Sequence, residues 1–242
     1  QSSDIREDAA AAAIYGSRGA SGVIAITTRQ GTSGASKIEF GASWNVNLGL
    51  MKKYEVLDAG EFRTALGKYI VTGQDKGSNV DVFKQLLNTK LSQNYNLAIT
   101  GGNENGKFRA SFLASSTNGT FKNSQLDKYI GTFNGQYKFL DKKLTLGFSL
   151  IAGHTTEDVI AVSNTAGSEG NIISAALQWN PTTDFKDATG KWVYPTNGSG
   201  NPLALLDAYD DQIKVNSILA NITASYKILN NLEYKFMYAI NN

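Results

Sequence analysis

The chain has 242 residues, no cysteine, one histidine and a formal net charge of +2. The lack of cysteine excludes disulfide bonds, thiolate metal sites and a cysteine nucleophile within it. A charge balance so close to neutral, without a local cluster of Lys and Arg, argues against nucleic-acid binding. No stretch approaches the roughly 18 consecutive apolar residues of a membrane-spanning helix, whereas the alternating strands of a transmembrane β-barrel leave no such peak.

Residues 4 to 31 predict a helix, a glycine-rich turn and a strand. Five consecutive alanines at 9–13 favour the helix, and acidic residues upstream favour its N-terminus: Asp4, Glu7 and Asp8. Gly16 ends the helix, because only glycine enters the left-handed conformation at little cost. Residues 23–28 are largely β-branched and predict a buried strand. Because the glycines follow the helix instead of preceding it, a phosphate-binding loop is not expected.

This stretch contains a long and specific motif, whose residues are Tyr15, Gly16, Ser17, Arg18, Gly19 and Gly22. With the flanking Glu-Asp-Ala and Thr-Thr-Arg-Gln-Gly sequences, it resembles the last part of the plug domain of SusC/RagA-type TonB-dependent outer-membrane transporters. Looser resemblance at 97–103, 121–124 and 201–206 extends over most of the chain. The resemblance implies the C-terminal part of an α+β plug domain in residues 1–36 and barrel strands in residues 37–242. It also implies that a signal peptide and most of the plug lie upstream of Gln1.

Residues 37–50 alternate between apolar and polar almost perfectly, which predicts one long strand. Fourteen residues exceed the 5–6 typical of soluble strands and suit the roughly 9–11 of a tilted membrane strand. We expect one face of this strand to contact lipid and the other to face the barrel lumen. The lipid face includes Phe40, Trp44 and Leu48, and the lumen face includes Glu39, Ser43 and Asn45.

Six further alternating segments predict strands around residues 95–99, 108–114, 129–137, 144–150, 218–226 and 232–240. Their connections alternate between long or medium (52–90, 116–127, 155–213) and tight (101–106, 140–143, 229–231). Short helices are expected at 59–69 and 82–91. Outer-membrane barrels have short periplasmic turns and long outer loops, so this parity places the tight turns in the periplasm. The predicted fold is all-β: an unclosed, partial transmembrane antiparallel β-barrel, which by resemblance belongs to a barrel of 22 strands.

Several residues invite a catalytic or metal-binding interpretation that the sequence does not favour. His154 has no recognisable nucleophile and acid beside it, so a solvated residue at the barrel rim is expected and no catalytic residue is assigned. The acidic residues of the loops lack the spacing of a calcium loop, so neither a metal nor a cofactor is expected: Glu157, Asp158, Asp207, Asp210 and Asp211. Arg18 is expected to pair with a carboxylate on the inner wall, because an unpaired buried charge is costly.

The long segment from 155 to 213 contains the candidate contact residues Trp179, Trp192 and Tyr194. Aromatic faces beside amide and carboxylate groups suit sugar rings, which stack on the former and hydrogen-bond to the latter. The hypothesis is that these residues touch the substrate or a lipoprotein lid. The alternative is that they pack the loop against itself or against a partner lipoprotein.

The resemblance also implies a function and a location. A member of this family is an integral protein of the bacterial outer membrane, in contact with its lipid, and imports a bulky nutrient with energy from the TonB complex. The implied substrate is a glycan or an oligopeptide, and the implied partner is a SusD-like surface lipoprotein. TonB itself would contact a segment upstream of the chain. No chemistry on the substrate is implied. The alternative is a structural or adhesive outer-membrane β-protein without a transport role.

Overall fold

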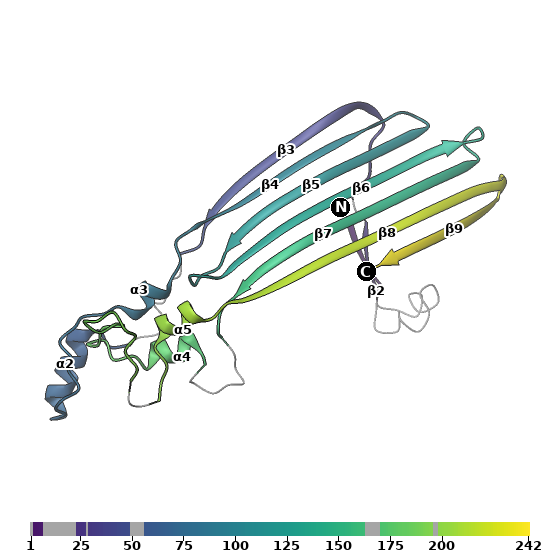
Figure 1. Ribbon diagram of the computed structural model, residues 1–242. Helices are drawn as coiled ribbons and strands as arrows, with labels where there is room; N and C mark the ends of the chain where they lie inside the picture. The colour runs from purple at the N-terminus through teal and green to yellow at the C-terminus, as the bar shows by residue number, and fades with distance from the viewer. Residues whose placement is uncertain (1, 7–22, 28, 49–55, 163–169, 196–197) are drawn as a thin grey trace.

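The structure is a computed structural model that describes residues 2–6, 23–27, 29–48, 56–162, 170–195 and 198–242. Seven long strands form one antiparallel sheet in which each strand pairs with its neighbours in sequence (Figure 1). Their bounds are β3 Gly34–Val46, β4 Leu91–Gly102, β5 Gly106–Asn118, β6 Gln125–Phe139, β7 Leu144–Val159, β8 Asp211–Leu229 and β9 Leu232–Asn241. The seven strands and their order confirm the sequence-based prediction of an unclosed barrel sheet.

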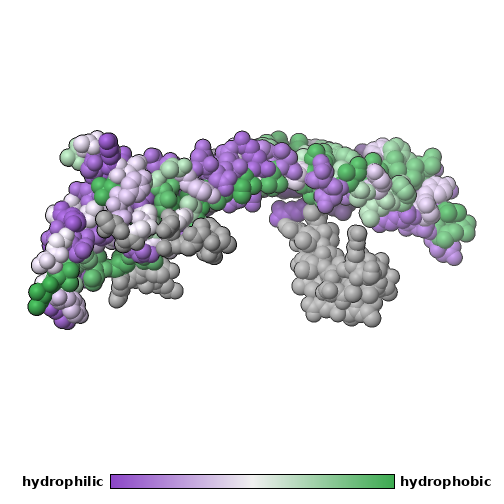
Figure 2. All heavy atoms as spheres, turned by 60° about the horizontal axis from the view of Figure 1, so that its bottom comes forward, coloured by the Kyte–Doolittle hydropathy of each residue, from purple (hydrophilic) through white to green (hydrophobic). Residues whose placement is uncertain are grey.

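The sheet is bowed like part of a cylinder wall, as the space-filling view in Figure 2 shows. β3 and β9 form its two edges and do not pair with each other. The helices gather at one end of the sheet (Figure 1), and their bounds are α2 Ala59–Lys68, α3 Val82–Leu86, α4 Ile172–Leu177 and α5 Pro202–Ala208. α2 and α3 lie within the helices predicted at 59–69 and 82–91, although α3 ends at Leu86 and is shorter than predicted. Among the described residues, no helix is long and apolar enough to cross a membrane.

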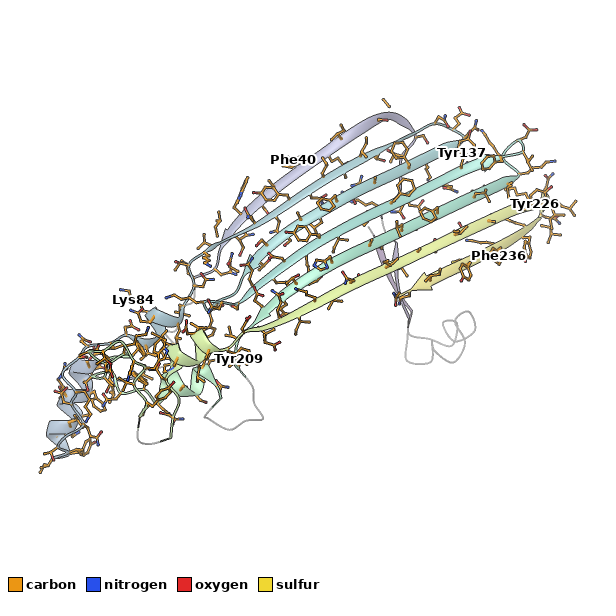
Figure 3. All side chains as sticks on the ribbon, in the orientation of Figure 1. Phe40, Lys84, Tyr137, Tyr209, Tyr226 and Phe236 are labelled. Atoms are coloured by element: carbon orange, nitrogen blue, oxygen red, sulfur yellow. The ribbon has the colours of Figure 1, made fainter. Side chains whose placement is uncertain are left out.

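One face of the sheet is apolar on every strand. Phe40 lies opposite Leu97, which in turn lies opposite Phe112, and the same register continues through β6 and β7 to Ile218 on β8. Figure 3 labels four members of this set: Phe40, Tyr137, Tyr226 and Phe236. Their side chains remain about half exposed or more. Strand alternation places Phe40 and Trp44 on this face and Glu39, Ser43 and Asn45 on the other, as predicted.

The apolar band runs obliquely across the strands. It covers Ile38–Val46 on β3 and Ile218–Tyr226 on β8, yet Phe40 is in register with Ile218 through the intervening strands. On β8 the band ends at Ile218, level with Phe40, whereas on β3 the same end of the band lies at Val46. Between β3 and β8 the band is thus displaced by six residues, or about 20 Å along the strands, over five strand spacings of about 4.8 Å. This displacement corresponds to a strand tilt of about 40° from the membrane normal, within the range of outer-membrane barrels. The sheet thus has the geometry of a membrane-spanning wall.

The N-terminal residues form a separate two-stranded sheet, in which β1 (Ser2–Arg6) pairs antiparallel with β2 (Val23–Thr27). β2 was predicted, but β1 was not, because the sequence analysis placed Asp4 just before a helix. In the structure Asp4 lies opposite Ala25, so its backbone pairs with β2. The five residues of β1 are too few for alternation to predict a strand. They adopt an extended conformation because their backbone groups pair with those of β2. The predicted alanine helix and the motif residues 15–22 lie outside the described residues.

Candidate functional site

The long connections fold into a compact unit at one end of the sheet (Figure 1), here called the loop unit (residues 56–90, 119–124, 160–162, 170–195 and 198–210). Each helix begins with a polar cap: Asp58 for α2, Asp81 for α3, Asn171 for α4 and Asn201 for α5. Caps of this kind satisfy backbone donors at helix starts and allow such short helices to form. The apolar sides of α3, α4 and α5 share a core made of Val82, Phe83, Leu86, Ala161, Ile172, Ala176, Trp179 and Leu206.

Asn201 connects α5 to a tight hairpin at residues 185–193. Its side-chain oxygen accepts hydrogen bonds from the backbone N–H groups of Leu203 and Ala204, while its amide donates to the carbonyls of Phe185 and Val193. Asn201 is fully buried. The helix at 202–208 was not predicted, although Asn before Pro is a common helix start. The second role of Asn201, as a clamp, depends on residues distant in sequence. The clamp fixes the hairpin that carries Trp192 and that Tyr194 directly follows.

Trp179 lies inside the loop unit with only 5% of its surface exposed. Its ring stacks on that of Phe185 at a centroid distance of 5.1 Å, and its indole N–H donates to the carbonyl of Thr183. Its edge contributes to an apolar groove of about 640 Å³. Leu57, Val80 and Phe83 also line that groove. Trp179 therefore supports the loop unit and lies at the base of a surface groove.

Trp192 and Tyr194 are placed differently. The ammonium group of Lys186 lies 4.1 Å from the centre of the Trp192 ring, so one face of this half-buried ring is already occupied. Tyr194 leaves 66% of its surface exposed. Of the three predicted contact residues, Tyr194 is the most exposed, Trp192 is half-buried with Lys186 over its ring, and Trp179 is buried.

The turn of this hairpin is fixed by Asp187. Its carboxylate accepts hydrogen bonds from the Thr189 hydroxyl and from the backbone N–H groups of Thr189 and Lys191. These hydrogen bonds, the one from the Thr189 hydroxyl first, hold the pKa of Asp187 below its usual value. At the other side of the loop unit, a hydrogen bond from the Arg63 guanidinium lowers the pKa of Asp75 in the same way.

The inner face of the sheet is polar and carries an ion pair. Arg109 on β5 lies 2.9 Å from the carboxylate of Glu39 on β3, and the Arg109 side chain is only 11% exposed. Glu39 is the kind of inner-wall carboxylate that Arg18 was predicted to meet, but its partner here is Arg109. Arg18 itself lies outside the described residues.

The remaining polar candidates form ordinary contacts. His154 lies beside Asn216, with 2.6 Å between its Nδ1 and the amide oxygen, and its ring is exposed. Asp158 accepts a hydrogen bond from Gln212, and Asp211 accepts one from Tyr209. Within the described parts of the chain, no three His, Cys, Asp or Glu side chains come together as metal ligands would.

Comparison with known proteins identifies similar chains. No family model matches. The chain is 29% identical over its whole length to TonB-dependent receptor P3 of Formosa agariphila, of which it covers 24%. It is 28% identical over 92% of its length to TonB-dependent receptor SusC of Bacteroides thetaiotaomicron, of which it also covers 24%. The chain thus spans about a quarter of the length of these curated relatives.

Solved structures show the same fold. The chain superposes on part of the RagAB peptide importer in its open-open state with a TM-score of 0.78, and in its closed-closed state with 0.75. The match covers 99% of this chain and 31% of the other, at 16% sequence identity. The chain therefore has the fold of about a third of the longer importer chain.

Proposed function

We propose, from the premise that this chain is homologous to part of the SusC-type TonB-dependent receptors of the outer membrane, that the whole protein imports a bulky nutrient using energy from TonB. The observation that carries the proposal is similarity to TonB-dependent receptor P3 along the entire chain, loops included. The oblique apolar band supports it, because a tilted membrane-spanning wall is what such a receptor requires. The role is transport without chemistry on the cargo.

The proposed cargo is a glycan or an oligopeptide, and the proposed partner is a SusD-like surface lipoprotein. Support comes from the loop unit, where Asn201 holds the hairpin that carries the half-buried Trp192 and precedes the exposed Tyr194. We propose that Tyr194 and Trp192 touch the cargo or the lipoprotein. Trp179 contributes by supporting this surface and by lining the adjacent groove.

Gene deletion in the source organism tests the transport role. Deletion should abolish growth on one of a panel of sole carbon sources, such as starch, pectin or a tryptic digest of casein, and loss of TonB should have the same effect. Growth that survives both deletions, together with reduced surface attachment, would favour the structural or adhesive alternative.

The contact residues need a separate comparison. Tyr194→Ala should weaken uptake or lipoprotein association several-fold. Tyr194→Phe keeps the aromatic ring and should retain most of the uptake and association. Tyr69→Ala removes another exposed aromatic residue, 68% exposed beside α2, and serves as the matched control. If Tyr194→Ala and the wild type show equal uptake and equal lipoprotein association, Tyr194 contacts neither and only packs the loop.

A further inference from the structure

The inner face of the sheet holds a polar cavity beside residues 29–33, here called the linker, which lead into β3. The cavity has a volume of about 420 Å³, and its walls come from the linker and from the adjacent strands β5 to β9. Because side chains alternate along a strand, the residues that line it face away from the apolar band. Two cross-strand rows contribute, with Lys107, Gln136, Gly147 and Thr223 in one row and Asn134, Ser149 and Asn221 in the next.

Two glycines define the shape of this cavity. Gly31 is buried against β5, where a Cβ atom would lie 2.5 Å from the carbonyl oxygen of Phe108, so the linker and the wall meet backbone to backbone. Within the wall, a Cβ on Gly147 would collide with the hydroxyl of Thr223. Glycine at 147 thus leaves room that a larger residue would fill, and Gly31 closes the cavity at the linker.

The charge of the lining is positive. Lys107 and Lys235 both line the cavity, and no Asp or Glu among the described residues does. Neither ammonium group forms an ion pair with the described part of the chain. Elsewhere on the same inner face, by contrast, the carboxylate of Glu39 lies 2.9 Å from Arg109. The cavity therefore contains two cations for which the described wall supplies no counter-charge.

The neutral polar side chains of the lining are available as well. At other places on the inner face such side chains pair with one another: the hydroxyls of Ser111 and Thr132 lie 2.6 Å apart, and the hydroxyl of Ser225 donates to Glu233 at 2.6 Å. In the cavity, five polar side chains form no hydrogen bond with any residue that the structure describes: Asn134, Gln136, Ser149, Asn221 and Thr223. Amides and hydroxyls of this kind can donate to an anion.

We infer that this cavity is a binding site for a carboxylate group of the cargo, with Lys107 and Lys235 as its cations and the neighbouring amides and hydroxyls as further donors. An ionised carboxylate only accepts hydrogen bonds, which matches a lining rich in donors and without a competing acid. The inference rests on the proposed function, because it narrows the proposed cargo to an acidic glycan or an acidic oligopeptide.

Calorimetric titration of the full-length receptor in detergent at low salt tests the site with two matched pairs of probes. The pairs are trigalacturonate with its methyl ester, and triglutamate with triglutamine. In at least one pair the acidic probe should bind about tenfold more tightly than the neutral one, and Lys107→Gln should remove this advantage, as expected for the loss of one charge-assisted hydrogen bond. Lys107→Arg keeps the charge and should keep most of the affinity. The pair that shows the preference identifies the source of the carboxylate.

Lys128→Gln is the matched control for the loss of one positive charge. Lys128 is half-buried, as Lys107 is, and lies on the same face of β6, six residues from Asn134 and about 20 Å away along the strand, outside the cavity. Equal weakening by Lys107→Gln and Lys128→Gln, or no preference within either pair, would overturn the inference. A Lys107→Gln receptor that melts at lower temperature but binds the probes unchanged would also overturn it, because a carboxylate of the receptor itself would then fill the cavity.

The transport role is measured separately, as TonB-dependent uptake of the same probes into cells. Binding that depends on Lys107 without uptake would leave the site standing and reject the proposed transport role. Uptake that shows no preference for the acidic probe of either pair would reject the site and leave the transport role standing.

Discussion

At the scale of single residues, neighbours along a strand differ sharply in what surrounds them. Phe112 lies near the middle of the apolar band, opposite Leu97 and Gly131, while Ser111 faces inward and its hydroxyl lies 2.6 Å from that of Thr132. The two residues are adjacent in sequence, but one lies on the apolar face of the sheet and the other on its polar face. This difference follows from the period of two along a strand.

The two positions should therefore tolerate charge unequally. Phe112→Arg should destabilise the barrel by about 2–4 kcal/mol, because a guanidinium at the centre of the bilayer loses its hydration. Ser111→Arg should destabilise the barrel much less, because a guanidinium on the lumen face stays hydrated. Urea unfolding of the full-length receptor in lipid vesicles measures both, and equal losses would contradict the assignment of the two faces.

The carboxylate of Asp187 makes the hairpin sensitive to acid. Because hydrogen bonds lower its pKa in the folded loop, it contributes stability above its ordinary value near 3.8, and this stability is lost as the pH falls through the lower, folded value. Tryptophan emission, to which nearby Trp192 contributes, should thus change at the acidic end of a titration. Asp187→Asn should remove that transition. A titration identical in variant and wild type would show that another group is responsible.

At the scale of elements, the loop unit and the sheet have separate cores. The loop unit buries its own apolar cluster around α3, α4 and α5, whereas the apolar side chains of the sheet point outward. Each therefore depends on a different environment: the loop unit on packing against itself, and the sheet on lipid and on neighbouring strands. Damage to one need not unfold the other.

A cavity in the loop core tests this separation. Leu86 on α3 is fully buried, so Leu86→Ala should destabilise the loop unit by about 2–5 kcal/mol. Proteinase K should then cut the loops of intact cells faster, while the heat-modifiable migration of the barrel stays unchanged. Leu177→Ala, at a position 39% exposed, is the control and should have a small effect. Loss of heat-modifiable migration in Leu86→Ala would show that the two units fold together.

At the scale of the whole molecule, all long connections leave the same end of the sheet, and the tight turns occupy the other. The β6–β7 turn even holds three consecutive non-glycine residues at positive φ: Leu140, Asp141 and Lys142. A turn this short has no room for the folded structure that the opposite end carries. Loop parity therefore continues to predict that the loop unit is extracellular and the turns periplasmic.

Cysteine labelling can check this orientation in the intact receptor. Tyr194→Cys should react with a membrane-impermeant maleimide on whole cells, because Tyr194 is exposed on the loop unit. Lys142→Cys should react only after the outer membrane is permeabilised. The reverse pattern would invert the orientation, and equal labelling at both sites would contradict a membrane-spanning wall.

The open edges of the sheet also belong to this scale. β3 and β9 each leave a row of backbone groups without a partner among the described strands. In lipid, every unpaired backbone group costs several kcal/mol, so both edges require further strands. The curated relatives are about four times longer than this chain, and the chain is similar to about a quarter of each of them.

The sequence by itself determined the seven strands, their order and the face that each residue occupies. Residues 37–46 illustrate why: alternation is a local property, and a single register follows once one face must be apolar. The glycine-rich motif and the similarity to TonB-dependent receptors were likewise readable without coordinates. The helices α4 and α5 were not predicted, although Asn before Pro at 201–202 is a common helix start.

The tertiary structure alone decided which aromatic residues are available and where the linker is held. Trp179 and Tyr194 look alike in sequence, but Phe185 and α3 enclose the first, whereas 66% of the surface of the second is exposed. Glycine is required at position 31 because a Cβ there would clash with the backbone of Phe108, more than seventy residues away in sequence. β1 forms because β2 needs a partner. In each case the outcome depends on atoms brought together from distant parts of the chain, and no local pattern contains that information.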